Sequence, residues 1–468
     1  LDSQNGVSLS SNSYQSNASF VYTGAYLFMG FGQTDGDINQ YYSILDNQLN
    51  TLVDYSPVDV NPQASQEYYE IVFSEFENEI YYVYSDNREF ANNIYVMKFD
   101  DNGNETWDSP IKIVETLQDG FLPSDDNVIG VISNPNEDGI IVLYNSGNFL
   151  GTKVNAIAID LDGQVLSEWD ESGNRLCEFN SDQYIEDFVA TPNGLMVTFK
   201  DNRSGSNDVY AQLVDYSNGN LLFDVNGLSI ADLENDQESS SMAFSDQGNE
   251  ALVCWEDFRL GTEYDLYCRS IAFTIDGDYQ LLDEFELAGQ SNTSGGNQTN
   301  PYVFSDDLSF LIAWEDSRNG VYTDIYFQEL NNFQAVLEDG GQMLCGADFD
   351  QLNPKIGSLD SLGNYLIYWD DMRSSGKEFL NNVFAQSYAL GGSNLSNEIA
   401  EIPMSYAIQS AYPNPFNPSV SIEFTIQNIS SIKLSIVDIK GSEIEVLYNG
   451  DIVAGTHLVD WQPSYDLS

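Results

Sequence analysis

An aspartate and an arginine recur together at five places in the chain, each time after an aromatic residue. The aspartates are Asp86, Asp201, Asp257, Asp316 and Asp371, and the arginines, each two residues later, are Arg88, Arg203, Arg259, Arg318 and Arg373. A further Asp or Asn follows each arginine, so a planar guanidinium there can make charge-assisted bonds that tie a loop to the next strand. A catalytic centre needs unlike residues at one place, whereas a structural repeat places like residues at many. We therefore predict that these ten residues are structural links.

Other chemistry is limited by the single histidine, His457, which lies outside the repeats. Within the repeats this excludes a Ser-His-Asp triad, a histidine-ligated metal and a histidine general base. Hydrolysis by a pair of carboxylates stays open, because the chain has 74 acidic residues, but no pair stands out among so many. The sequence thus predicts no catalytic residue, no required cofactor and a protein that is not an enzyme.

Three acidic turns offer oxygen ligands of the kind that calcium prefers. They contain the pairs Asp35 and Asp37, Asp160 and Asp162, and Asp276 and Asp278. None has the full spacing of an EF-hand loop, so ordinary turn formation is the alternative interpretation.

Two of the four cysteines, Cys254 and Cys268, lie on either side of one predicted hairpin. A disulfide bond between them can form in an oxidising compartment, and two buried thiols are an equally good interpretation. No Cys-x-x-Cys pattern or Cys/His cluster indicates zinc.

The spacing of the repeat predicts the elements that position these residues. Successive arginines are 115, 56, 59 and 55 residues apart, so the first interval hides one copy. A degenerate copy without the aspartate and the arginine lies at residues 141–144 and 155–158. One more apolar run, at residues 26–31, lies one period before the first arginine. Seven copies result.

Each copy contains four short strands separated by turns, the size of one blade of a β-propeller. Asn-Gly and Asp-Gly turns between the third and fourth strands support this division. We predict an all-β fold with a seven-bladed β-propeller over residues 1–390. Residues 5–10 resemble residues 226–231, a predicted fourth strand, so we expect them to complete the last blade and close the ring.

The formal net charge of −59 bears on the partners of the protein. Its mean surface potential should repel nucleic acids, anionic lipids and anionic polysaccharides, so nucleic-acid binding is excluded. No run of 18 apolar residues predicts a transmembrane helix. The chain starts at Leu1 without a basic and apolar leader, so we expect the signal peptide of an exported protein to have been removed already.

Beyond a polar linker at residues 391–405, several motifs occur in order: a Pro-rich segment at 411–419 and apolar segments at 422–424, 434–441 and 454–461. Together they resemble the C-terminal sorting domain of type IX secretion, known from the Bacteroidetes and related phyla. Period-two alternation predicts a small antiparallel β-sandwich at residues 406–468. Members of the family continue past the Asp-Leu-Ser with which this chain ends, so we expect a truncated copy.

The resemblance implies that the type IX secretion machinery is a partner and that the protein reaches the cell surface or the extracellular space. We predict a non-catalytic surface propeller for adhesion, for contact with glycans or surface polysaccharide, or for self-assembly into an extracellular layer or filament. The alternative is a secreted glycoside hydrolase like the sialidases. Residues 101–107 resemble the Asp-box of that family. In sialidases several arginines converge on a carboxylated ligand.

Overall fold

The computed structural model describes residues 14–35, 37–46, 51–59, 64–89, 91–114, 124–136, 139–274, 277–289, 295–306, 309–338, 340–358, 364–372, 382–389, 407–412, 420–426, 430–437, 443–452 and 455–461. Every regular element in these residues is a β-strand, which confirms the predicted all-β fold. No helix long and apolar enough to cross a membrane occurs in these residues. The chain divides into two compact units, of which the larger covers residues 9–382 and the smaller includes residues 383–468.

Seven antiparallel sheets follow one another in the described residues between 14 and 389. Sheet 1 contains β1 (Tyr14–Tyr22), β2 (Tyr26–Asp35), β3 (Asp37–Asp46) and β4 (Thr51–Asp59). Sheet 2 contains β5 (Gln66–Ser74), β6 (Glu79–Asp86), β7 (Asn93–Asp100) and β8 (Ile111–Val114). Sheet 3 contains β9 (Asp125–Ser133), β10 (Ile140–Asn148), β11 (Gly151–Ile159) and β12 (Asn174–Arg175). Sheet 4 contains β13 (Gln183–Thr191), β14 (Gly194–Asp201), β15 (Asp208–Val214) and β16 (Leu228–Ala231).

The next two sheets have five strands and the last has three. Sheet 5 contains β17 (Gln237–Ser245), β18 (Glu250–Asp257), β19 (Asp265–Phe273), β20 (Tyr279–Leu281) and β21 (Phe285–Ala288). Sheet 6 contains β22 (Gln298–Ser305), β23 (Phe310–Asp316), β24 (Asp324–Asn331), β25 (Gln334–Ala335) and β26 (Gln342–Cys345). Sheet 7 contains β27 (Gln351–Ser358), β28 (Asn364–Asp371) and β29 (Asn382–Ala389).

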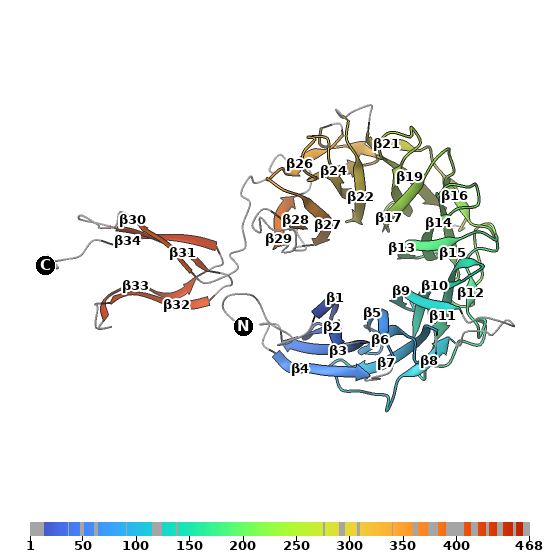
Figure 1. The fold of residues 1–468 in the computed structure, drawn as a ribbon, viewed down its shortest axis with the longest axis horizontal. Helices are drawn as coiled ribbons and strands as arrows, with labels where there is room; N and C mark the ends of the chain where they lie inside the picture. Colours follow the sequence, from blue (N-terminus) through green and yellow to red (C-terminus); the bar gives the residue numbers. More distant parts are fainter. Residues whose placement is uncertain are drawn as a thin grey trace. The chain divides into compact units, whose positions relative to one another are not determined.

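Within each sheet the chain runs mainly from strand to neighbouring strand. Figure 1 shows the first strands of the sheets, such as β5, β9 and β13, on the inner side of the larger unit, and the last strands, such as β8 and β16, on the outer side. The second strands of sheets 2 to 6 are buried over most of their length, and in β6 seven of eight residues are buried. Strands buried in this way are apolar almost throughout rather than at alternate positions.

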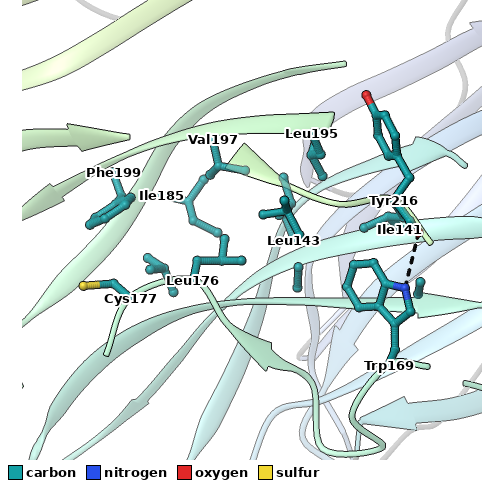
Figure 2. Close-up of a cluster of buried hydrophobic side chains, with 14 of the residues drawn as sticks. Ile141, Leu143, Trp169, Leu176, Cys177, Ile185, Leu195, Val197, Phe199 and Tyr216 are labelled. Atoms are coloured by element: carbon teal, nitrogen blue, oxygen red, sulfur yellow. Dashed lines mark hydrogen bonds between the residues drawn. The ribbon is translucent and has the colours of Figure 1, made fainter. Parts of the chain in front are cut away.

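A separate apolar core fills each space between neighbouring sheets from sheet 1 to sheet 6. Between sheets 3 and 4 it contains Leu143, Leu176, Val197 and Phe199, all fully buried, and Trp169 (Figure 2). Equivalent cores join sheets 1 and 2, 2 and 3, 4 and 5, and 5 and 6. Each large apolar side chain buried there stabilises the fold by roughly 1.5–3 kcal/mol. Sheets stacked face to face in chain order make a β-propeller, as predicted.

The predicted closing strand, residues 5–10, lies outside the described residues. Closure of the ring and the count of seven blades therefore stay predictions, as do the propeller's end at residue 390 and the linker at 391–405.

The smaller unit has two antiparallel sheets of its own. One contains β30 (Ala407–Tyr412), β31 (Val420–Ile426) and β34 (Gly455–Trp461), and the other contains β32 (Ser430–Val437) and β33 (Glu443–Ile452). Ile422 and Trp461 of the first sheet are buried against Ile436 and Leu447 of the second. Two sheets that share a core form the predicted small sandwich.

Candidate functional site in the third sheet

The intact repeat forms a compact side-chain cluster, which is clearest in sheet 5. The carboxylate of Asp257 accepts hydrogen bonds from the backbone N of Arg259 at 2.8 Å, from its Nε at 2.8 Å and from its Nη2 at 2.6 Å. It also accepts one from Trp255 Nε1 at 2.9 Å. The guanidinium lies 3.7 Å from the ring centre of Tyr267 on the next strand. We call this arrangement of aspartate, arginine and tyrosine the staple.

The staple recurs in sheets 2, 4 and 6, where the arginine pairs with the aspartate two residues before it. The arginines stack on Tyr95, Tyr210 and Tyr326. In sheet 7 Asp371 accepts a hydrogen bond from Trp369 Nε1 at 3.0 Å, and Arg373 lies outside the described residues. Each described arginine of the repeat is bonded within its own staple, and none of these bonds links one repeat arginine to another's aspartate.

A glutamine that the sequence did not suggest lies beside each of these clusters, and it donates to the repeat aspartate in sheets 2, 4 and 6. Gln66, Gln183, Gln237, Gln298 and Gln351 each lie directly opposite the repeat aspartate on the neighbouring strand. In sheet 4, Gln183 Nε2 donates to Asp201 Oδ2 at 3.0 Å. Burial would raise the pKa of Asp201, but hydrogen bonds from Arg203 and Ser181 bring it below its usual value. The signal was available, because the glutamine always precedes the aspartate by 18 or 20 residues.

In sheet 3 every position of the staple has changed. The strand pairing places Ser146 opposite Lys153 and Tyr144 opposite Asn155, as Asp201 lies opposite Asp208 and Phe199 opposite Tyr210 in sheet 4. Ser146 therefore replaces the aspartate, and Asn155 the tyrosine under the arginine. Five substitutions result: Asp126 for glutamine, Ser146 for aspartate, Asn148 for arginine, Lys153 for the second aspartate or asparagine, and Asn155 for tyrosine.

A pocket of about 930 Å³ opens at these positions, and all five replaced residues line it. Ser146 and Asn155 are smaller than the aspartate and the tyrosine that they replace, and Asn148 stands at the position of the stacked arginine. The pocket thus occupies the space that the stacked arginine and tyrosine fill in intact repeats. Its volume lies within the range of about 300–1,000 Å³ usual for ligand sites.

One part of the pocket lining comes from residues 170 and 172–175, at the end of the long loop between β11 and β12. Arg175 pairs with Asn155 in the strand ladder and comes directly before Leu176 and Cys177, which are fully buried in the core shown in Figure 2. Tyr144 Oη donates to the carbonyl of Ser172 at 3.1 Å. Gly173, with a φ of +85°, lies against the same hydroxyl, where a Cβ would approach it to 2.0 Å. The loop is therefore held by the core and by Tyr144.

Charges of both signs line the pocket. Lys153 is buried and donates to the carbonyl of Ser181. Burial lowers the pKa of Lys153, and the nearby charge of Arg175 lowers it further. Asp170 Oδ1 accepts hydrogen bonds from the hydroxyl and the backbone N of Ser172, and these hold its pKa below the usual value. Asp126 and Glu178 complete the charged lining.

The rim of the pocket is apolar and exposed. Phe149 and Leu150, at the turn between β10 and β11, line the pocket and are 72% and 74% exposed. An exposed aromatic ring beside a polar cavity offers a flat apolar surface to a ligand that also makes hydrogen bonds.

In one of the acidic turns predicted for calcium, the described carboxylate accepts hydrogen bonds from the turn itself. Asp160 Oδ1 accepts hydrogen bonds from the backbone N of Asp162 at 3.0 Å and of Gln164 at 2.8 Å. Asp35 and Asp37 are partners in the backbone register of β2 and β3, and Asp276 lies outside the described residues. No group of three or more His, Cys, Asp or Glu side chains in the described part of the chain is placed to hold a metal ion. Calcium binding stays a prediction.

We expect Asp160→Ala to lower the free energy of unfolding by about 1 kcal/mol, because it removes the acceptor of two backbone N–H groups. Asp160→Asn keeps an acceptor oxygen and should cost less than half as much. Urea unfolding of both variants, with calcium and with a chelator, measures this. A different result would make the carboxylate a calcium ligand. Calcium would then stabilise the wild type but neither variant, so that Asp160→Asn would lose as much stability as Asp160→Ala only in the presence of calcium.

Partly buried carboxylates on the second strands of two sheets bond to the neighbouring sheet. Glu256 Oε1 accepts a hydrogen bond from the backbone N of Asn300 at 2.8 Å, and Glu315 Oε1 accepts one from Asn353 N at 2.8 Å. Asn300 and Asn353 have φ values of +50° and +55°, at a bulge in the first strand of the next sheet. These acids bond the bulged backbone of the next sheet, so we assign them a structural role.

Glu256 makes the stability of the protein depend on pH. Burial, helped by the charges of Glu238 and Glu186, raises the pKa of Glu256 to about 7. The folded state then binds more protons than the unfolded state between pH 4.5 and 7, so this group lowers stability as pH rises through that window. Glu256→Gln should raise the free energy of unfolding at pH 8 by more than about 1 kcal/mol and change it little at pH 4.5. Denaturant unfolding at both values tests this, and an equal change at both would contradict it.

The sulfur atoms of Cys254 and Cys268 are bonded, at an S–S distance of 2.01 Å. The bond joins residues that lie opposite each other on β18 and β19. Cys177 and Cys345 are buried free thiols.

Comparisons with known proteins identify the smaller unit. Residues 410–455 match the family model of the secretion system C-terminal sorting domain. A search of curated proteins finds no match. Among solved structures, the β-propeller domain of the Trilobed protease from Pyrococcus furiosus is 10% identical, with 82% of this chain and 99% of that one covered and a TM-score of 0.44. A periplasmic gluconolactonase from Pseudomonas aeruginosa is 11% identical over 90% and 94% of the two chains, with a TM-score of 0.43.

An exo-1,5-alpha-L-arabinanase from a bovine ruminal metagenomic library is 11% identical over 57% of this chain and 96% of that one, with a TM-score of 0.30. Likenesses this low carry no argument about function. The matched motif does confirm the predicted sorting domain, which indicates export to the cell surface or beyond. The chain thus carries a C-terminal sorting domain of the type IX secretion system, which the type IX machinery handles, on a β-propeller.

Proposed function

We propose that the protein is a non-catalytic propeller of the cell surface or extracellular space that contacts glycans through the pocket of sheet 3. The pocket at the broken repeat carries this proposal. In the intact repeats the polar side chains bond to one another, as Asp257 and Arg259 do. In sheet 3 the residues at the same positions line an open space. A repeat without its staple is less stable than an intact one. We therefore interpret the replacement of the staple residues in sheet 3 as an adaptation for binding a ligand.

The lining fits a carbohydrate. Sugar rings carry hydroxyl groups that both donate and accept, and the pocket offers Ser146, Asn155 and Asp126 to meet them. Sugar rings also have flat C–H faces, which pack on exposed aromatic rings such as that of Phe149. Export supports the same proposal, because polysaccharides are abundant outside the cell.

The experiment is to incubate the purified chain with a panel of oligosaccharides and to measure binding and product release on the same samples. We expect at least one glycan to bind and none to be cleaved. Release of shortened sugars at a rate that scales with the protein concentration would overturn the proposal in favour of a glycoside hydrolase. The absence of binding by every glycan in the panel would also overturn it.

A further inference from the structure

The cations of the pocket stand out against the charge of the chain. Only 15 residues of 468 are basic, against 74 acidic ones, and two of the 15 line this pocket. The other described arginines all have side-chain bonds: four belong to staples, and Arg269 donates to the carbonyls of Leu282 and Ile230. Arg175 alone among the arginines of the described residues makes no side-chain hydrogen bond or ion pair.

Lys153 is a second cation of the pocket, and although the charges of Asp182 and Asp201 act on it, the pKa of Lys153 stays below its usual value. Its Nζ donates to the carbonyl of Ser181, and no carboxylate of the described residues forms an ion pair with it. Burying an ammonium without an opposite charge is costly, and a second cation nearby adds repulsion. An anion placed between Lys153 and Arg175 would relieve both costs, because guanidinium and ammonium groups make charge-assisted bonds to carboxylates.

The acids of the pocket restrict which anion fits. Asp126, Asp170 and Glu178 lie in the same lining and would repel a ligand that is negative all round, such as phosphate or sulfate. A sugar that bears one carboxylate per ring satisfies both sets of groups. Its carboxylate meets the two cations, and its hydroxyls donate to the carboxylates and to the carbonyl oxygen of Asn155.

We infer that the pocket binds an oligosaccharide of hexuronate rings, with the ring carboxylate held between Arg175 and Lys153. This rests on the proposed function and specifies its ligand. The net charge of −59 does not prevent it, because at a salt concentration of about 0.15 M that field is screened over about 8 Å, whereas the pocket contacts are direct. The loop that carries Arg175 is fixed by the core around Leu176, so the backbone of Arg175 is in place before the ligand arrives.

The test uses matched ligands that differ only in charge. Trimers of galacturonate, glucuronate and guluronate, each also as its methyl ester, are titrated calorimetrically into the full chain at 0.15 M salt. The esters keep the rings and hydroxyls and lose the charge. We expect at least one acid trimer to bind about tenfold or more tightly than its ester. Arg175→Ala should remove most of this difference and leave the affinity for the ester within about twofold.

Two controls separate charge from folding. Lys433→Ala removes one positive charge from the smaller unit and should leave the affinity for the acid trimer unchanged. Arg175→Lys keeps the charge without the planar fork and should give an intermediate affinity. Because Arg175 is exposed, its variants should fold as the wild type does.

The outcomes distinguish this inference from the proposed function. If acids and esters bind equally, or if neutral sugars bind and Arg175→Ala changes nothing, the pocket is a neutral glycan site and the inference is wrong, while the proposed function stands. If no acid trimer binds, the inference is also wrong. If no glycan of any kind binds, both fail.

Discussion

Asp257→Ala should lower the free energy of unfolding by about 3–5 kcal/mol. The substitution leaves the guanidinium of Arg259 without its carboxylate and the indole N–H of Trp255 without an acceptor, in a cluster where the aspartate side chain is 0% exposed and the arginine 18% exposed. Urea unfolding followed by tryptophan fluorescence measures the change. Asp283→Ala is the matched control, because Asp283 is exposed in the same part of the chain and should be nearly neutral.

The same variant separates a structural staple from a binding residue. At a temperature where Asp257→Ala is still folded, its affinity for the glycan should equal that of the wild type, because the staple of sheet 5 does not line the pocket. A variant that kept its stability but lost binding would show that the repeat arginines act on a ligand, as the alternative hypothesis of a sialidase-like hydrolase requires.

Restoring the staple in sheet 3 should abolish glycan binding without unfolding the protein. The variant combines four substitutions that copy the intact repeats: Asp126→Gln, Ser146→Asp, Asn148→Arg and Asn155→Tyr. The new tyrosine and arginine would stack in the pocket, as Tyr267 and Arg259 do in sheet 5. We expect affinity to fall about 100-fold or more and the free energy of unfolding to be at least that of the wild type.

Calorimetry with the best glycan and urea unfolding measure these two effects. The single substitution Asn148→Arg is the control, because it adds the arginine without the aspartate and tyrosine that would hold it, so binding should fall much less. Full affinity in a folded four-fold variant would mean that the glycan binds elsewhere.

The sequence predicted the staples because their main partners are neighbours in the chain. Asp257 and Arg259 are two residues apart, so their pairing needs only one turn. The glutamine opposite each aspartate was missed because it lies on another strand, and only the register of the sheet brings Gln237 to Asp257. Cys254 and Cys268 were an easier case, because one hairpin places them opposite each other.

The pocket could not be predicted from patterns in the sequence. The loss of aspartate and arginine near residue 146 was visible, but nothing in the chain showed whether other side chains fill the space. The answer depends on Arg175, which reaches sheet 3 through a long loop anchored by Trp169, whose Nε1 donates to the carbonyl of Tyr216 at 3.3 Å (Figure 2). Such a contact between distant segments follows from packing and not from spacing.

The most direct test of a binding pocket at the broken repeat is a crystal structure of the chain soaked with the tightest-binding oligosaccharide. We predict electron density for the sugar between Asn155 and Arg175, with one ring against Phe149 and the staples of sheets 4 to 6 unchanged. Sugar density against the staples or the inner strands, with the pocket of sheet 3 filled only by water, would contradict the account.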